Sequence, residues 1–387
     1  MNILFCTQTF LSKTMGGSKV VMELAEEFER LGWKSDVISP ADFAPTQGQN
    51  IYAAYPANLR RYLREHAHEY DVVDYDHLYL PYSRAEFPGE TLFVARSVLL
   101  LHQLETARIP KTRGFRSAVR TLVKGRREAR NLGAMFCQAH KTVVEADLVN
   151  VSNTHDKTEL IKRGVPESKV VVIPFGIDRY RRIMFDTISS EPPEQPTVAF
   201  VGTFDNRKGA TDLPSIVRDI LQSVADVRFR LLGTGSSEPS VLSHFDKGLR
   251  DRIDVIPEYG PEELPGLLAD CSVGVFPSYV EGFGLGVLEM LAASIPVVAY
   301  DSPGPPMMLP LEYLVTAGDL HGLAKKAIGL LRDPFELARA RNWAKERSRQ
   351  FCSEEIATQT VEIYRDHLER KRSQRKDETA LSSRRAS

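Results

Sequence analysis

Residues 2–39, NILFCTQTFLSKTMGGSKVVMELAEEFERLGWKSDVIS, contain the pattern that decides the fold. The short apolar run at 2–7 predicts a strand, and the run at 34–39 predicts another. A helix is predicted between them because four apolar side chains recur at helical spacing: Val21, Leu24, Phe28 and Leu31. Gly32 follows, where a glycine commonly ends a helix. A strand, a helix and a strand in this order indicate a right-handed parallel unit, and hence an α/β domain.

The same alternation of short apolar runs and helical segments continues along the chain and is interrupted once. Further strands are predicted by the runs at 71–76, 91–96, 146–152 and 169–174. The Ser- and Pro-rich segment 189–197, SSEPPEQPT, predicts a linker. A second series of strands is predicted at 197–203, 227–235, 252–257, 271–278 and 295–301. We therefore expect two doubly wound, Rossmann-like α/β domains that face each other across a cleft, the place where ligands bind in such architectures.

The predicted domain boundaries follow from these changes of pattern. We expect an N-terminal domain at 1–175, a linker at 176–195 and a C-terminal domain at 196–345. Apolar residues at helical spacing predict a final helix at 346–370. The remaining tail, 371–387, is basic and poor in apolar residues, so it is expected to lack regular structure.

Composition excludes several classes of protein. The 387 residues carry a net charge of −1, from 50 basic and 51 acidic residues, which argues against a nucleic-acid-binding protein. Neither a signal peptide nor a run of about 18 apolar residues is present, so a cytoplasmic location is expected. The four cysteines lie far apart and lack metal-binding spacing, which predicts reduced thiols in the protein core.

The richest candidate for chemistry is the segment 277–298, PSYVEGFGLGVLEMLAASIPVV. Glu281 and Glu289 bracket seven residues, and glycines at 282 and 284 open a predicted helix between them. Glycines let the backbone approach a ligand, and free N–H groups at a helix start favour anionic or hydroxyl-rich groups. At a rise of ~1.5 Å per residue, Gly284 to Glu289 spans about 7–8 Å, which suits a sugar near one carboxylate and a ribose near the other. The alternative is a surface helix with two solvated glutamates.

Two further segments predict contacts with a substrate. In FVGTFDNRKGATDL (200–213) a strand ends at Gly202, and Arg207 and Lys208 follow in a turn, where two cations would neutralise a diphosphate. A solvated turn is the alternative. The Gly16–Gly17 pair before the first helix would admit a substrate close to the helix start, but it is not the GxGxxG fingerprint of a dinucleotide site.

Together these segments resemble the family-4, group-1 glycosyltransferases of the GT-B fold, over nearly the whole chain. Supporting matches are VIPFGID (172–178), EEL (262–264), Pro277-Ser278, PVVA (296–299) and LVTAGD (314–319). The resemblance implies a retaining hexosyltransferase that needs no metal or other cofactor and takes UDP-glucose or a similar UDP-hexose. It also implies a glycan or lipid-linked sugar as acceptor, in polysaccharide or cell-envelope glycan synthesis.

The same resemblance implies a role for each candidate residue. Glu281 would bind hydroxyls of the donor sugar, and Glu289 those of the ribose. Lys208 would stabilise the departing diphosphate. The final helix would cross back to the N-terminal domain, the acceptor side. The remaining donor-site and cleft-lining positions would be reached mainly through their backbone: Gly16, Gly17, Gly202, Phe283, Gly284 and Leu285.

Two positions depart from the family pattern. Thr203 stands where the family usually has an arginine, a charge that Arg207 would supply from another position. The histidine usual at the end of the fourth strand has His102 as its nearest counterpart, and Arg96 is the alternative. A buried structural role for His102 is the simpler interpretation, since a lone histidine after an apolar run is usually structural.

The stretch Arg108 to Arg130 holds nine basic residues against one acidic residue, with apolar residues between them. One hypothesis is a basic amphipathic helix that attaches the protein to an anionic membrane from the cytoplasmic side, and a solvated helix face is the alternative. For the whole chain, a GT-B sugar-nucleotide epimerase and a non-catalytic sugar-nucleotide binder stay open. An NAD-dependent oxidoreductase is the weakest alternative, because the glycine fingerprint is missing.

Overall fold

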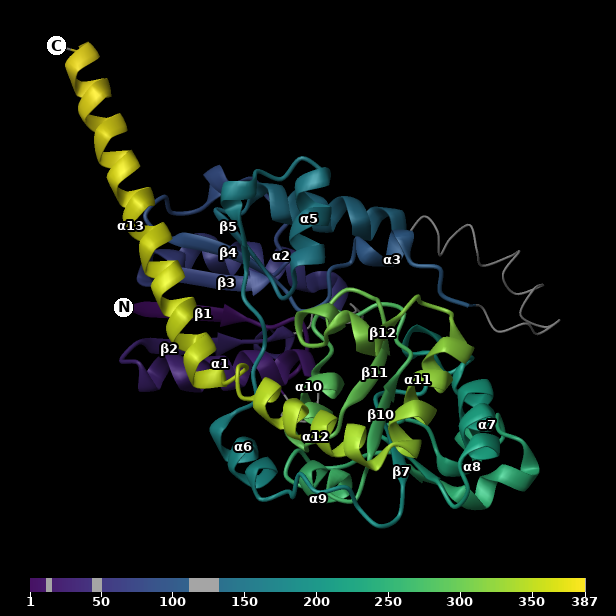
Figure 1. The fold of residues 1–387 in the computed structure, drawn as a ribbon. Coiled ribbons are helices and arrows are strands. Elements are labelled where there is room, and N and C mark those ends of the chain that lie inside the picture. Colours follow the sequence, from purple (N-terminus) through teal and green to yellow (C-terminus); the bar gives the residue numbers. More distant parts are fainter. Residues whose placement is uncertain (12–15, 44–50, 111–131, 387) are drawn as a thin grey trace. The chain divides into compact units, whose positions relative to one another are not determined.

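The computed structural model describes residues 1–11, 16–43, 51–110 and 132–386 (Figure 1). The chain divides into two compact units. Unit 1 comprises Met1–His102, Lys124–Pro174 and Ser353–Ser387, and unit 2 comprises Gln103–Val123 and Phe175–Cys352. In the described ranges, no helix combines the length and the apolar character needed to cross a membrane.

Unit 1 is built on a parallel sheet with the strand order β2-β1-β3-β4-β5-β6. Because β1 lies between β2 and β3, the direction of winding reverses there, and the carboxyl ends of β1 and β3 form a topological switch point. The strands are β1 (Asn2–Cys6), β2 (Lys34–Ile38), β3 (Val72–Asp76), β4 (Leu92–Ser97), β5 (Leu148–Val151) and β6 (Val170–Val172). The helices of unit 1 include α1 (Gly16–Arg30), α2 (Ile51–His66), α5 (Thr154–Lys162) and α13 (Ser353–Ala386).

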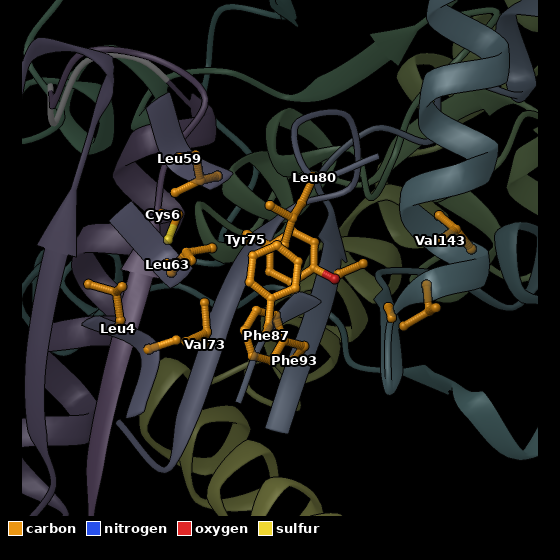
Figure 2. Packing of buried hydrophobic residues seen from close by; sticks show 14 of the residues in the cluster. Leu4, Cys6, Leu59, Leu63, Val73, Tyr75, Leu80, Phe87, Phe93 and Val143 are labelled. Carbon is orange, nitrogen blue, oxygen red and sulfur yellow. The ribbon is translucent and has the colours of Figure 1, made fainter. Parts of the chain in front are cut away.

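The core of unit 1 lies between the sheet and its helices. Strand residues such as Val73 and Phe93 pack with Leu59 and Leu63 of α2, as Figure 2 shows. On the other covering helix, α1, three of the four predicted apolar positions are buried: Val21, Leu24 and Phe28. Leu31 lies just past the helix and is 41% exposed. Gly32 has a φ of +82°, so it ends α1 in the conformation that favours glycine.

Unit 2 has a second parallel sheet, with the order β12-β11-β10-β7-β8-β9. The winding reverses between β7 and β10. Its strands are β7 (Thr197–Val201), β8 (Arg228–Leu232), β9 (Ile253–Ile256), β10 (Val273–Phe276), β11 (Val297–Tyr300) and β12 (Leu314–Val315). Its helices are α3 (Gln103–Thr106), α6 (Arg179–Asp186), α7 (Leu213–Ser223), α8 (Glu238–Leu242), α9 (Leu264–Leu268), α10 (Leu285–Ala292), α11 (Leu320–Arg332) and α12 (Pro334–Ser348). The sequence had not predicted β12 as a strand, because two residues carry no periodicity.

The structure differs from the predicted tail at 371–387, because helix α13 continues through this segment to Ala386, the last residue described (Figure 1). Two basic residues at the start of that segment are paired with carboxylates of unit 1, Lys371 mostly buried and Arg372 partly exposed. Lys371 pairs with Asp147 at 2.6 Å, and Arg372 pairs with Asp71 at 2.7 Å. These ion pairs fasten the helix to unit 1 beyond its apolar contacts.

The predicted linker, 176–195, also contains regular structure, since α6 lies within it. Asp178 caps the helix by accepting a hydrogen bond from the Arg181 N–H at 3.0 Å. The linker composition that marked this segment comes only after α6, at 189–197.

Candidate functional site

The loop after β7 presents two cations at the carboxyl edge of the unit 2 sheet. Asp205 orders this loop, because its carboxylate accepts from the Lys208 N–H at 3.1 Å and from the Thr203 hydroxyl at 2.6 Å. Gly209 ends the turn at a φ of +85°. A Cβ there would lie 2.3 Å from the Pro277 carbonyl oxygen, so only glycine lets the two loops at the switch point approach so closely.

Glu281, in the loop after β10, pairs with the cations of the loop after β7. The Lys208 ammonium lies 2.5 Å from Glu281 Oε1, and the Ser278 hydroxyl donates to the same oxygen at 2.5 Å. The Arg207 guanidinium is 3.8 Å from it and also donates to the Val280 carbonyl at 3.1 Å. Glu281 is only 6% exposed. Its carboxylate is therefore a buried anion that two cations compensate, at the switch point of the sheet.

The glycine-rich segment then turns into α10. Gly284 precedes the helix at a φ of +90°, so the N–H groups from Leu285 onward start the helix with no side chain over them. A Cβ on Gly286 would lie 2.8 Å from the Val201 carbonyl oxygen, which brings the first turn of α10 directly against the end of β7. Phe283 is buried, with its ring 5.8 Å from Phe175 and 5.5 Å from Phe351. The helix start, with its positive dipole end, therefore lies at the same edge as Lys208.

Glu289 lies on the second turn of α10 and is 8% exposed. Arg181 of α6 donates from Nη1 to Glu289 Oε1 at 2.8 Å. Tyr259, in the loop after β9, belongs to the same cluster. Burial raises the pKa of its hydroxyl, the Glu289 carboxylate raises it further, and Arg181 opposes the effect.

Three contributors to this site escaped prediction as functional residues: Arg181, Ser278 and Asp212. Asp212 accepts from the Tyr279 hydroxyl at 2.6 Å and the Tyr300 hydroxyl at 2.8 Å, and thereby holds the loop that carries Glu281. Ser278 lies within a motif that the family resemblance had marked. Arg181 and Asp212 gave no local indication, because the site residues that they bond, Glu289, Tyr279 and Tyr300, are 67 to 108 residues away in the chain.

Unit 1 has a pocket at its own switch point, where β1, β3 and β4 end and α1 begins. Its floor is a neutralised pair, in which Arg96 donates to both oxygens of Asp74, at 3.1 and 2.6 Å. Asp76 is 8% exposed and accepts from the Leu78 N–H at 2.9 Å. Gly16 is the first residue of α1. The residues that line the pocket are Cys6, Thr7, Gln8, Gly17, Val21, Asp74, Asp76, Arg96 and Val98.

His102 lies apart from the pocket lining, in contrast to Arg96. It is 1% exposed, and within the described part of the chain neither ring nitrogen has a hydrogen-bond partner. Its ring centre lies 5.9 Å from that of His140. Burial lowers the pKa of His102 to about 4, with smaller effects from Arg163, His77 and His140. Both candidates for this position are buried, and of the two only Arg96 lines the pocket.

The contacts described above do not test the predicted membrane attachment or the predicted independence from metal ions. The basic stretch at 108–130 lies almost wholly outside the described residues, which resume at 132. Among the side chains that the structure describes, no group of three or more histidine, cysteine, aspartate or glutamate residues is arranged to hold a metal ion.

Comparison with known proteins shows what the chain is similar to. Residues 195–333 match the family model described as "Glycosyl transferases group 1". A D-inositol 3-phosphate glycosyltransferase of Nocardia farcinica is 27% identical over 176 residues, which cover 42% of this chain and 39% of the relative. The chain spans less than two thirds of the length of the curated relatives that it matches first.

Solved structures resemble the chain over a greater length. A sucrose-phosphate synthase from Thermosynechococcus elongatus has a TM-score of 0.70 at 19% identity, covering 95% of this chain and 98% of that one. The Anabaena protein HepE, solved in complex with UDP-glucose, has a TM-score of 0.64 at 17% identity, covering 95% and 100%. These likenesses confirm the predicted GT-B fold, and the family match agrees with the resemblance found in the sequence over residues 195–333.

Proposed function

Because residues 195–333 form a group 1 glycosyltransferase domain within a GT-B chain, we propose that the protein transfers a sugar from a nucleotide donor to a glycan or lipid-linked acceptor. The observation that carries the proposal is the contact between Lys208 and Glu281 beside the glycine-rich start of α10. We take UDP-glucose or a similar UDP-hexose as the donor, and polysaccharide or cell-envelope glycan synthesis as the setting. The UDP-glucose bound to HepE supports that choice.

In this proposal each donor group meets a matching group of unit 2. Glu281 accepts hydrogen bonds from hydroxyls of the hexose, and Glu289 accepts them from the ribose. The N–H groups of Phe283, Gly284 and Leu285 hold the sugar and the phosphates, since a helix start binds anions. Lys208 contacts both Glu281 and the diphosphate, so that one cation links the sugar-binding carboxylate to the leaving group.

Charge stabilisation at the diphosphate is the main contribution to catalysis in this scheme. As the bond to the anomeric carbon breaks, negative charge grows on the phosphate, and Lys208, Arg207 and the dipole of α10 oppose it. Thr203 contributes no charge. We propose that an acceptor hydroxyl attacks from the face that the diphosphate leaves, with retention of configuration and no metal ion. The two glutamates then bind substrate, and they are not the acid and nucleophile of a glycosidase.

We propose that the accepting hydroxyl approaches unit 1 at its pocket, which has room for about one water molecule and not for a whole sugar. Asp76 and Gln8 give it hydrogen-bonding groups for hydroxyls, while the Asp74–Arg96 pair leaves its floor neutral. This chemistry favours an uncharged, hydroxyl-rich group at the accepting end.

A separate proposal places the protein at the cytoplasmic face of an anionic membrane through Arg108 to Arg130. Absence of co-sedimentation with anionic vesicles at low salt would exclude that attachment.

The transferase proposal is tested by nucleotide release from a panel of sugar nucleotides, with EDTA present. Wild type is expected to hydrolyse one UDP-hexose slowly, and Glu281→Ala is expected to lose at least about 100-fold of that rate. Glu312→Ala removes an exposed glutamate of the same unit and serves as the matched control. An altered sugar on intact nucleotide would indicate the epimerase instead. Donor binding without release, even with a panel of acceptor glycans, would indicate a non-catalytic binder.

A further inference from the structure

We propose that Arg181 is a positioning residue of the donor site, whose guanidinium orients the Glu289 carboxylate for the ribose diol of the nucleotide. The inference rests on the proposed function, since Glu289 is a ribose ligand only within it. Arg181 is not a catalytic residue in this proposal. It lies on α6, in a segment that the sequence had marked only as a linker.

The pair between Arg181 and Glu289 is buried on both sides. The two side chains are 4% and 10% exposed, and Nη1 lies 2.8 Å from Oε1. A buried charge needs a partner, and loss of one partner leaves the other uncompensated. Arg181 therefore stabilises the buried charge of Glu289 and contributes to the placement of that carboxylate.

Asp178 aims the arginine. One of its oxygens caps α6 by accepting from the Arg181 backbone N–H at 3.0 Å, and the other accepts from Arg181 Nε. The guanidinium is thus held along one edge by Asp178, and it presents Nη1 to Glu289. This use of two positions of a planar fork is specific to arginine, because a lysine has a single ammonium group.

The chain before α6 is fixed against the same donor segment. The Ile177 N–H donates to the Phe351 carbonyl at 3.0 Å, and the rings of Phe175 and Phe283 lie 5.8 Å apart. α6 is therefore anchored to α10 through the charge pair and to the loop before α10 through Phe283. Because it contacts the donor segment at both points, this part of the predicted linker belongs to the candidate donor site.

A carboxylate accepts from both hydroxyls of a vicinal diol most favourably when its two oxygens face them together. The hydrogen bond from Arg181 to Oε1 fixes the rotation of the carboxylate about its terminal bond. Without that bond the rotation of the Glu289 carboxylate would be less restricted, and the ribose hydroxyls would meet a less preorganised acceptor. The effect is confined to the diol, so a nucleotide without it is the diagnostic probe.

The test measures dissociation constants by calorimetry for UDP and GDP, each against its 2′,3′-dideoxy counterpart. Arg181→Met is expected to weaken binding of the preferred ribonucleotide by about 10- to 100-fold and to change its dideoxy counterpart less than about threefold. Asp178→Asn, which keeps the charge of Arg181, is expected to show a smaller loss of the same kind. KM for the donor rises accordingly, while kcat changes little.

The matched control is Arg341→Met. Arg341 is the other fully buried arginine described in unit 2, and it donates to the carbonyls of Cys271, Ser189 and Ser190. The Arg341→Met substitution should destabilise unit 2 without changing the ratio of the dissociation constants for the ribonucleotide and its dideoxy counterpart. Equal losses for ribo- and dideoxynucleotides, or no loss for either, would overturn the inference for Arg181. If Arg181→Met does not fold, Asp178→Asn decides by the same criterion. A wild-type protein that binds neither nucleotide refutes the proposed function itself.

Discussion

Replacing His102 with phenylalanine is expected to remove much of the acid sensitivity of unit 1. The side chain is 1% exposed, and within the described ranges its ring nitrogens have no hydrogen-bond partners. Burial is the main reason that its pKa falls from 6.5 to about 4. Phenylalanine has a similar shape and no polar atoms to desolvate, so the variant should keep its stability near pH 7.

The magnitude follows from the difference in proton affinity. The unfolded chain binds the proton at a pKa near 6.5 and the native chain only near 4, so the unfolded state holds more protons between these values. Stability is therefore complete above pH 6.5 and declines as the pH falls toward 4. At ~1.36 kcal/mol per pKa unit the full loss is about 3 kcal/mol, of which roughly 2 kcal/mol falls between pH 7 and 5.

Each unit can be followed separately, because the chain has two tryptophans and one lies in each unit: Trp33 and Trp343. In a Trp343→Phe background, urea unfolding followed by Trp33 fluorescence reports unit 1 at pH 7, 6 and 5. The His102→Phe variant should lose about 2 kcal/mol less than its parent over this range. His68→Gln, which changes an exposed histidine of the same unit, is the control.

Parallel pH profiles for the parent and His102→Phe would refute this reasoning. They would mean that His102 gains its proton as readily in the native state as in the unfolded chain, so that water reaches the ring. A nucleotide-release rate that also fell more than about 100-fold in the variant would restore the catalytic interpretation of this histidine.

Three further substitutions test the packing around the two sites, with urea unfolding followed through the tryptophan of each unit. Gly209→Ala should destabilise unit 2 by more than ~2 kcal/mol, because its Cβ would meet the Pro277 carbonyl at 2.3 Å. Asp212→Ala should cost unit 2 about 2–4 kcal/mol, since two tyrosine hydroxyls lose their acceptor. Tyr364→Phe should cost unit 1 about 1–3 kcal/mol, because its hydroxyl bonds Asp74, Arg96 and Asn150. An unchanged midpoint would contradict each of these.

Much of the fold was predictable because its evidence is local. Buried parallel strands appear as short apolar runs, and α1 shows its periodicity and its terminal Gly32 within one segment. The exceptions are informative. β12 is two residues long and has no pattern to detect, while the basic start of the tail is ordered by Asp147 and Asp71, which lie more than 200 residues away.

The candidate site divides in the same way. Glu281, Glu289 and Lys208 were predicted because each lies in a short motif, although the motifs did not say that Lys208 touches Glu281. Arg96 and His102 were left as alternatives for one position, since both lie near the end of one predicted strand. Both side chains are buried, and the pocket separated them: Arg96 lines it and His102 does not, which only the folded chain can show.

By itself, the sequence determined that this is a two-domain α/β chain, and it identified the segments that carry glycosyltransferase motifs. Both conclusions rest on residues separated by fewer than about ten positions, where helical and strand periods act. Only the tertiary structure decided which polar and charged side chains contact each other. Arg181 finds Glu289 across 108 residues, and Asp212 finds Tyr300 across 88. Such pairs depend on which strand ends adjoin which helices, and that order is set by burial of the whole core.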